Sequence, residues 1–225
     1  MTTTPVDPAS PVPFGRDGMT GLLDPVTALH PQSQELADRF TGMVSPETVE
    51  RVVMESYTAL GRTATIKIHL PVLALRFATE RLTALAQAKG TLVKEQPEVL
   101  FVCVQNAGRS QIAAAYLEHL SGGRVHVRSA GSMPAGEIDA TVLTALSEAG
   151  LDVVEAFPKP LTDDVVAAAD VVVTMGCGDS CPIYPGKRYL DWSVTDPAGL
   201  TLDEVRTVRD DIAARVQQLL TELDH

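Results

Sequence analysis

The stretch VLFVCVQNAGRSQIAAAYLEHL, from Val99 to Leu120, decides the fold of the second half of the chain. Residues 99–104 are almost all apolar and predict a buried strand, whereas residues 110–121 have the apolar spacing of a helix. A strand that leads directly into a helix is the repeating unit of a parallel α/β sheet. Cys103 stands at the end of this strand and Arg109 at the start of the helix, which is the edge where such sheets bind ligands.

The same alternation continues to the end of the sequence. Further strands are predicted over residues 125–129, 170–175 and 187–192, and further helices over 139–149, 162–169 and 203–223. Residues 99–225 therefore predict an α/β domain with a four-stranded parallel sheet and helices on both faces.

The first half of the chain has a different pattern. Residues 1–30 are rich in Pro, Thr, Gly and Asp and predict a flexible arm. Helical patterns follow over about residues 32–44, after a cap formed by Ser45 and Pro46, and over about 71–89. Residues 31–90 thus predict a three-helix, all-α bundle, and the polar stretch 91–98 predicts a linker between domains.

Composition excludes several classes of function. The net charge of −11 argues against binding to nucleic acid or to an anionic membrane surface. No apolar run approaches the ~18 residues of a membrane span, and no signal peptide is recognised, so a cytoplasmic location is expected. Three cysteines are an odd number and too few for a disulfide framework, which points to chemical roles for the thiols.

The segment CVQNAGR bends between a strand and a helix, so several backbone N–H groups are expected to face inward. The helix N-terminus adds positive potential, and the guanidinium of Arg109 can bind two oxygens of a tetrahedral oxyanion. The same field favours the thiolate form of Cys103, which predicts a nucleophile. The alternative is a structural buried cysteine beside an exposed arginine. The candidate substrate-binding residues are Val104, Gln105, Asn106, Ala107, Gly108, Arg109 and Ser110.

The pattern C-x5-R-S, present here as CVQNAGRS, resembles the phosphate loop of the low-molecular-weight protein tyrosine phosphatase superfamily. Within that superfamily the sequence is most similar to the three-cysteine, thioredoxin-coupled arsenate reductases. The resemblance covers about residues 99–223, and the helical extension before it is similar to that of some actinobacterial members. It implies reduction of arsenate to arsenite, starting with attack of Cys103 on arsenate held by the loop.

The dipeptide Asp196-Pro197 predicts a carboxylate on a rigid turn near the end of the last strand. On its own it could be a surface turn. The resemblance implies that Asp196 is the general acid that protonates the departing oxygen.

Cys177 and Cys181 follow the predicted strand 170–175. From the residues alone they could be inert apolar side chains, half of a zinc site or a redox pair. The resemblance implies a relay, in which Cys177 attacks Cys103 and releases arsenite, and Cys181 then attacks Cys177. An external dithiol protein, thioredoxin or a mycoredoxin, would reduce the resulting disulfide.

No bound cofactor and no metal are expected. Some relatives bind potassium through a glutamate whose matching position here is Ala114, so the resemblance does not extend to that ion. The N-terminal bundle is expected to form a homodimer, with partner docking or simple stabilisation as alternatives.

Two other functions remain open. A phosphatase acting on phosphotyrosine would share Cys103, Arg109 and Asp196, but it would leave the other two thiols unused, and the chain is only 4% aromatic. An arsenite-binding or redox-sensing protein would use the thiols as soft ligands without turnover and would not need Asp196 or Arg109.

Overall fold

The computed structural model describes residues 25–64, 67–151, 153, 155–176 and 182–224. Three helices precede the sheet, and helices alternate with strands after it begins. The helices are α1 (Pro25–Arg39), α2 (Pro46–Gly61), α3 (Leu70–Ala88), α4 (Arg109–Ser121), α5 (Ala140–Glu148), α6 (Asp163–Ala168) and α7 (Leu202–Leu223), with a short 3-10 turn, η2 (Lys67–His69), before α3. The strands are β1 (Glu98–Cys103), β2 (His126–Gly131), β3 (Val171–Met175) and β4 (Arg188–Asp191).

The four strands form one parallel sheet in the order β2-β1-β3-β4. All six residues of β1 are buried, as its continuous apolar sequence predicts for a central parallel strand. At its carboxyl end Cys103 is in register with Gly131 of β2 and Met175 of β3. This confirms the predicted fold class and places Cys103 at the edge of the sheet where loops converge.

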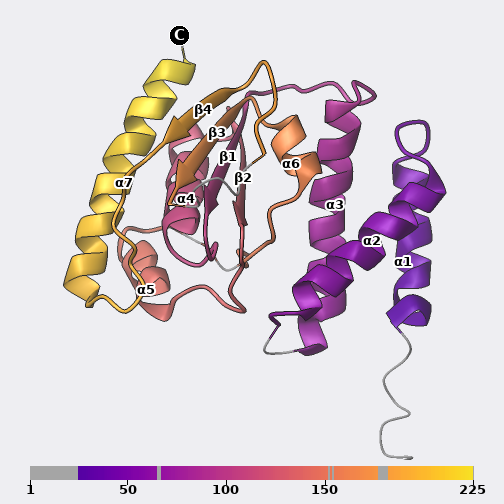
Figure 1. Cartoon of the computed structure of the whole chain (residues 1–225), viewed down its shortest axis with the longest axis horizontal. Helices are drawn as coiled ribbons and strands as arrows, with labels where there is room; N and C mark the ends of the chain where they lie inside the picture. The colour runs from indigo at the N-terminus through magenta and orange to yellow at the C-terminus, as the bar shows by residue number, and fades with distance from the viewer. Residues whose placement is uncertain (1–24, 65–66, 152, 154, 177–181, 225) are drawn as a thin grey trace, which may run out of the picture.

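Helices cover both faces of the sheet (Figure 1). α4, α5 and α7 pack on one face around Phe101, Ile112 and Ile212. On the other face lie α6 and α3, with Ala84 of α3 packed in one cluster with Leu100 of β1. None of the described helices combines the length and apolar character needed to cross a bilayer.

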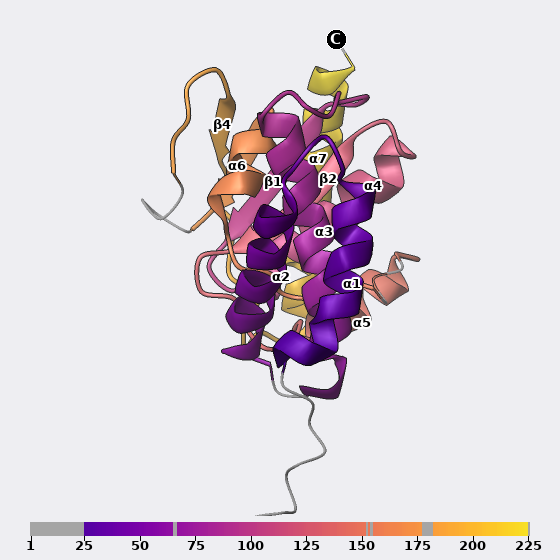
Figure 2. The ribbon, with the colours of Figure 1, turned by 90° about the vertical axis from the view of Figure 1, so that its right-hand side faces the viewer.

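Helix α3 belongs to two cores at once. Its residues Ala78, Leu82 and Ala86 pack in a cluster with α1 and α2, whereas Ala84 faces the sheet. In Figures 1 and 2, α3 accordingly lies between the sheet and the pair formed by α1 and α2. The N-terminal bundle therefore sits directly on the α/β domain, in contact with it along most of α3.

The cap of α2 agrees with the sequence signal, whereas the bounds of α1 differ from the prediction. The Ser45 hydroxyl accepts a hydrogen bond from Thr48 N at the start of α2, with Pro46 in the first turn. α1 spans 25–39, whereas the sequence predicted about 32–44. Pro31 lies within this helix. Beyond Arg39 the buried Phe40 and Val44 continue the apolar pattern from a turn. Residues 25–30 of the predicted arm are thus helical.

Replacing Arg81 with methionine should lower the free energy of unfolding by about 2–4 kcal/mol. Arg81 of α3 donates to Asp164 of α6 (2.9 Å) and to Glu55 of α2 (2.9 Å), and the Asp164 side chain is only 10% exposed. Methionine keeps the apolar stem but leaves that carboxylate without its cation. Urea unfolding at neutral pH measures the loss. Arg51→Met, which removes an exposed ion pair with Glu55, should cost less than about 1 kcal/mol. Equal losses would contradict this role of Arg81.

Candidate active site

The loop from Cys103 to Arg109 turns its carbonyl groups outward. The carbonyls of residues 103, 104, 105 and 107 accept hydrogen bonds from the N–H groups of residues 132, 133, 135 and 139, at 2.8–3.1 Å. A trans peptide points its N–H opposite to its carbonyl, so the following amides face the inside of the loop. The segment after β2 thus holds the loop in the shape of an anion-binding nest, as the sequence predicted.

Two donors converge on the Cys103 sulfur. Asn106 N donates to Sγ at 3.2 Å, and Asn106 itself has a left-handed backbone (φ 49°). The Ser110 hydroxyl lies 3.0 Å from the same sulfur. Asn106 Nδ2 donates to Ser110 Oγ at 2.8 Å, so the serine proton is free to point at sulfur. Cys103 is 2% exposed, and both contacts bring a hydrogen-bond donor to its sulfur.

The orientation of the Asn106 amide is set by its surroundings. Its Oδ1 accepts hydrogen bonds from Lys159 N (2.8 Å) and from Gln111 Nε2 (3.2 Å), which leaves Nδ2 facing Ser110. Sequence reasoning included Asn106 and Ser110 but missed Gln111 and Lys159. No local pattern marks Lys159, because it lies 53 positions from Asn106 in the sequence. Gln111 is only five positions away, but its contact with Phe157 spans 46 positions.

Arg109 is buried at the start of α4, with 8% of its surface exposed. Its Nη2 donates to Asp196 Oδ2 at 2.6 Å, and Nη1 lies against Gly176, where an added Cβ would be only 2.7 Å away. Arg109 Nε is buried and has no hydrogen-bond partner among the described residues. A charged donor without an acceptor beside an amide-lined loop is suited to an incoming oxyanion.

Asp196 lies on the turn that covers the loop. Its Oδ1 accepts from Ala198 N at 3.2 Å, and its side chain is 52% exposed. The adjacent Pro197 packs so closely on Gly108 that a Cβ there would be 2.5 Å from the proline ring. A cavity of about 200 Å³ opens beside this contact, lined by Gln105, Ala107, Gly108, Ala135, Glu137, Asp139, Asp196, Pro197 and Ala198. The structure therefore brings together Cys103, Arg109 and Asp196.

Cys177 and Cys181 lie outside the described residues. The described chain reaches Gly176, directly after β3, and Gly176 contacts the guanidinium of Arg109. Gly176 has φ 74°, in the left-handed region, and the close approach of Arg109 leaves no room for a side chain.

The fold and the geometry together define a parallel α/β protein whose cysteine-centred loop suits a tetrahedral oxyanion. The chain belongs to the low molecular weight phosphotyrosine protein phosphatase family, whose model matches residues 98–225. A second model, described as the N-terminal domain of protein-tyrosine-phosphatase-like proteins, matches residues 29–86.

Individual relatives extend the comparison. The chain is similar to the structure of a thioredoxin-dependent arsenate reductase from Corynebacterium glutamicum, with 50% identity and a TM-score of 0.82, covering 88% of this chain and 97% of that one. It is 31% identical to arsenate reductase 1 of Staphylococcus epidermidis over 55% of this chain and 95% of that protein. An arginine phosphatase from Geobacillus stearothermophilus shares 25% identity at a TM-score of 0.51, over 57% and 93% of the two chains.

Proposed function

We propose that this protein reduces arsenate to arsenite, with Cys103 as the nucleophile. The observation that carries the proposal is the Cys103 sulfur, which accepts from Asn106 N and lies 3.0 Å from the Ser110 hydroxyl. Beside it is a buried arginine whose Nε has no hydrogen-bond partner in the part of the chain that the structure describes. Arsenate is a tetrahedral oxyanion of the kind this loop can hold. The arsenate reductases from Corynebacterium and Staphylococcus support the choice of substrate.

The proposed first step forms a bond between the sulfur of Cys103 and arsenic and expels one arsenate oxygen as water. Asp196, beside Arg109, is proposed to supply the proton that this oxygen needs. Cys177 then attacks Cys103. A disulfide forms, the electron pair of the sulfur–arsenic bond stays on arsenic, and arsenite leaves as arsenic(III).

The proposed regeneration uses the third thiol. Cys181 attacks Cys177, which frees Cys103 and moves the disulfide to the pair Cys177–Cys181. A dithiol protein then reduces that pair, so that no bound cofactor is needed. Thioredoxin is the proposed reductant, supported by the thioredoxin-dependent relative, and a mycoredoxin is the alternative. A cytoplasmic location fits this thiol chemistry, and a homodimer through the N-terminal helices remains part of the proposal.

A phosphatase is the second candidate function, favoured by the similarity to the arginine phosphatase from Geobacillus. Phosphate and arsenate have the same shape and charge, so the loop alone does not separate the two activities. In the phosphatase, water would hydrolyse a cysteinyl-phosphate, and Cys177 and Cys181 would have no role.

The test is arsenate-dependent oxidation of NADPH by the purified chain with thioredoxin and thioredoxin reductase. We expect turnover that needs all three proteins, and in Cys181→Ser a trapped Cys103–Cys177 disulfide detected by mass spectrometry. Turnover that instead requires a mycoredoxin, its low-molecular-weight thiol and the NADPH-dependent reductase of that thiol would identify the mycoredoxin as the reductant. Hydrolysis of p-nitrophenyl phosphate without any arsenate-dependent oxidation of NADPH would show that the protein is a phosphatase and not a reductase.

A further inference from the structure

Residues 157–159, here called the bridging segment, connect the N-terminal helices to the nucleophile loop. The ring of Phe157 packs in a cluster with apolar side chains from α2 and α3: Leu60, Leu70, Ala74 and Phe77. The carbonyl of Phe157 accepts a hydrogen bond from Gln111 Nε2 at 3.2 Å. Gln111 Nε2 also donates to the backbone carbonyl of Asn106 at 2.9 Å. The segment is therefore fixed to the N-terminal helices on one side and to the loop on the other.

Lys159 makes the second connection. Its ammonium pairs with Glu80 of α3 at 2.8 Å, and its side chain is 14% exposed. Its backbone N donates to Asn106 Oδ1 at 2.8 Å, and its carbonyl accepts from Gly131 N of β2 at 2.8 Å. One residue thus contacts both helix α3 and the amide that directs the Ser110 proton.

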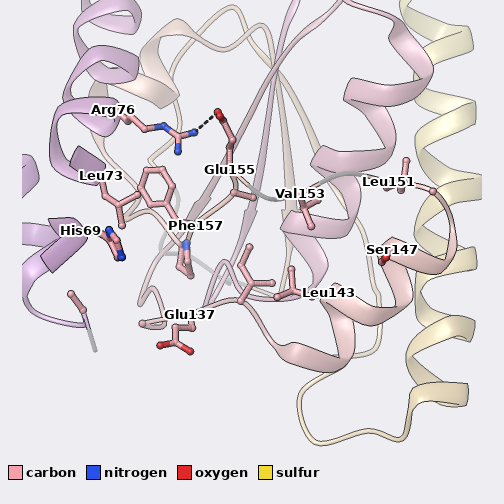
Figure 3. A pocket seen from close by; sticks show the side chains of 16 residues that line it. His69, Leu73, Arg76, Glu137, Leu143, Ser147, Leu151, Val153, Glu155 and Phe157 are labelled. Carbon is pink, nitrogen blue, oxygen red and sulfur yellow. Dashed lines mark hydrogen bonds and ion pairs between the residues drawn. The ribbon is translucent and has the colours of Figure 1, made fainter. Parts of the chain in front are cut away.

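Two cavities flank the bridging segment, whose residues Phe157 and Pro158 are themselves buried. A cavity of about 890 Å³ lies along it between α3 and α5, where Arg76 reaches across to Glu155 at 3.1 Å (Figure 3). A second cavity of about 410 Å³ lies between the segment and α4, beside the Gln111 contact, and its charged lining residues are Arg76, Glu80, Glu118, Glu155 and Lys159. With cavities on both sides, the position of the segment is set by its contacts with α3 and by its backbone pairing with Gly131 of β2.

We propose that Glu80 and Lys159 are positioning residues, through which helix α3 holds Asn106 so that Ser110 donates to the Cys103 sulfur. The N-terminal helices thereby contribute to the reactivity of Cys103 as well as to stability. This proposal rests on the proposed function for the role of Cys103, but its test needs neither arsenate nor a reductant.

The experiment measures alkylation of Cys103 by iodoacetamide in the fully reduced, full-length protein, quantified by mass spectrometry on the tryptic peptide that ends at Arg109 and contains only this cysteine. Glu80→Lys places two ammonium groups together. We expect the rate at neutral pH to fall about threefold to tenfold, the scale of one partly shielded charge pair. At about pH 9.5 the rates should converge, because most thiols are then ionised in every variant.

The double variant with Glu80→Lys and Lys159→Glu restores an ion pair with the charges exchanged, and it should recover the wild-type rate at neutral pH. Glu155→Gln is the matched control, since it removes the neighbouring ion pair with Arg76, in which Glu155 is exposed, and should leave alkylation unchanged. Glu80→Gln, which keeps the shape of the side chain, should give a smaller loss than Glu80→Lys.

Three results would overturn the proposal: an unchanged rate at neutral pH in both Glu80 variants, an equal change at neutral and high pH, or no recovery in the double variant. An equal change at both pH values would show altered access to Cys103. An arsenate assay that fails while these alkylation results hold would reject the substrate and leave the positioning role intact.

Discussion

Replacing Arg109 with lysine should lower kcat/KM for arsenate by about a hundredfold to a thousandfold. Lysine keeps the positive charge but loses the planar fork that can bind two oxygens at once. Arg109 is buried, with Nη1 against Gly176, Nη2 on Asp196 and Nε without a partner among the described residues, so the fork has a defined orientation that an ammonium group does not reproduce. Steady-state kinetics with the thioredoxin system measures the change.

Arg124→Lys is the matched control, because Arg124 lies beyond the end of α4 and pairs with Asp224 on the surface. It should change kcat/KM by less than about twofold. If Arg109→Lys retained most of the activity, charge alone would suffice and the fork would have no special role. If arsenic bound stoichiometrically without turnover, and equally well in Arg109→Lys, the protein would be a metalloid-binding protein and not a reductase.

The nucleophile loop could be predicted from sequence because its signals are local. Cys103 and Arg109 are six positions apart, and the buried strand and the helix on either side fix where each must lie. Asp196 could be included through the resemblance to the phosphatase superfamily, because an Asp-Pro turn on its own could equally be a surface turn. The strand order β2-β1-β3-β4 was not predicted, since parallel pairing depends on contacts between distant segments.

The supports of the loop could not be predicted for a physical reason. Gln111 and Lys159 act through hydrogen bonds whose geometry exists only after β2, α3 and the bridging segment have come together. In the same way, the apolar residues of α3 predict a buried helix but do not say that Ala84 faces the sheet while Leu82 faces α1 and α2. A periodic pattern indicates that one face of a helix is buried, but it does not identify the helix or strand against which that face packs.

Replacing Asp196 with asparagine should lower kcat for arsenate by about a hundredfold to a thousandfold. Asparagine has nearly the same shape, but it cannot donate a proton to the oxygen that leaves arsenic. The Asp196 carboxylate also accepts a hydrogen bond from Nη2 of Arg109 at 2.6 Å, and it places negative charge beside the proposed anion site. The variant should therefore bind inorganic phosphate about threefold to tenfold more tightly, a modest gain because Asp196 is half-exposed.

A lower kcat together with a lower inhibition constant for phosphate distinguishes an acid from a structural residue, because a misfolded turn would lower kcat but raise the inhibition constant. Asp191→Asn is the control: Asp191 accepts a hydrogen bond from Thr174 at 2.6 Å on the adjacent strand, away from Arg109, and its loss should alter neither constant. Hydrolysis of p-nitrophenyl phosphate should be less sensitive to Asp196→Asn than arsenate reduction, because nitrophenolate leaves with little need of a proton. An unchanged kcat for arsenate would place the proton donor elsewhere and reduce Asp196 to a competitor for Arg109.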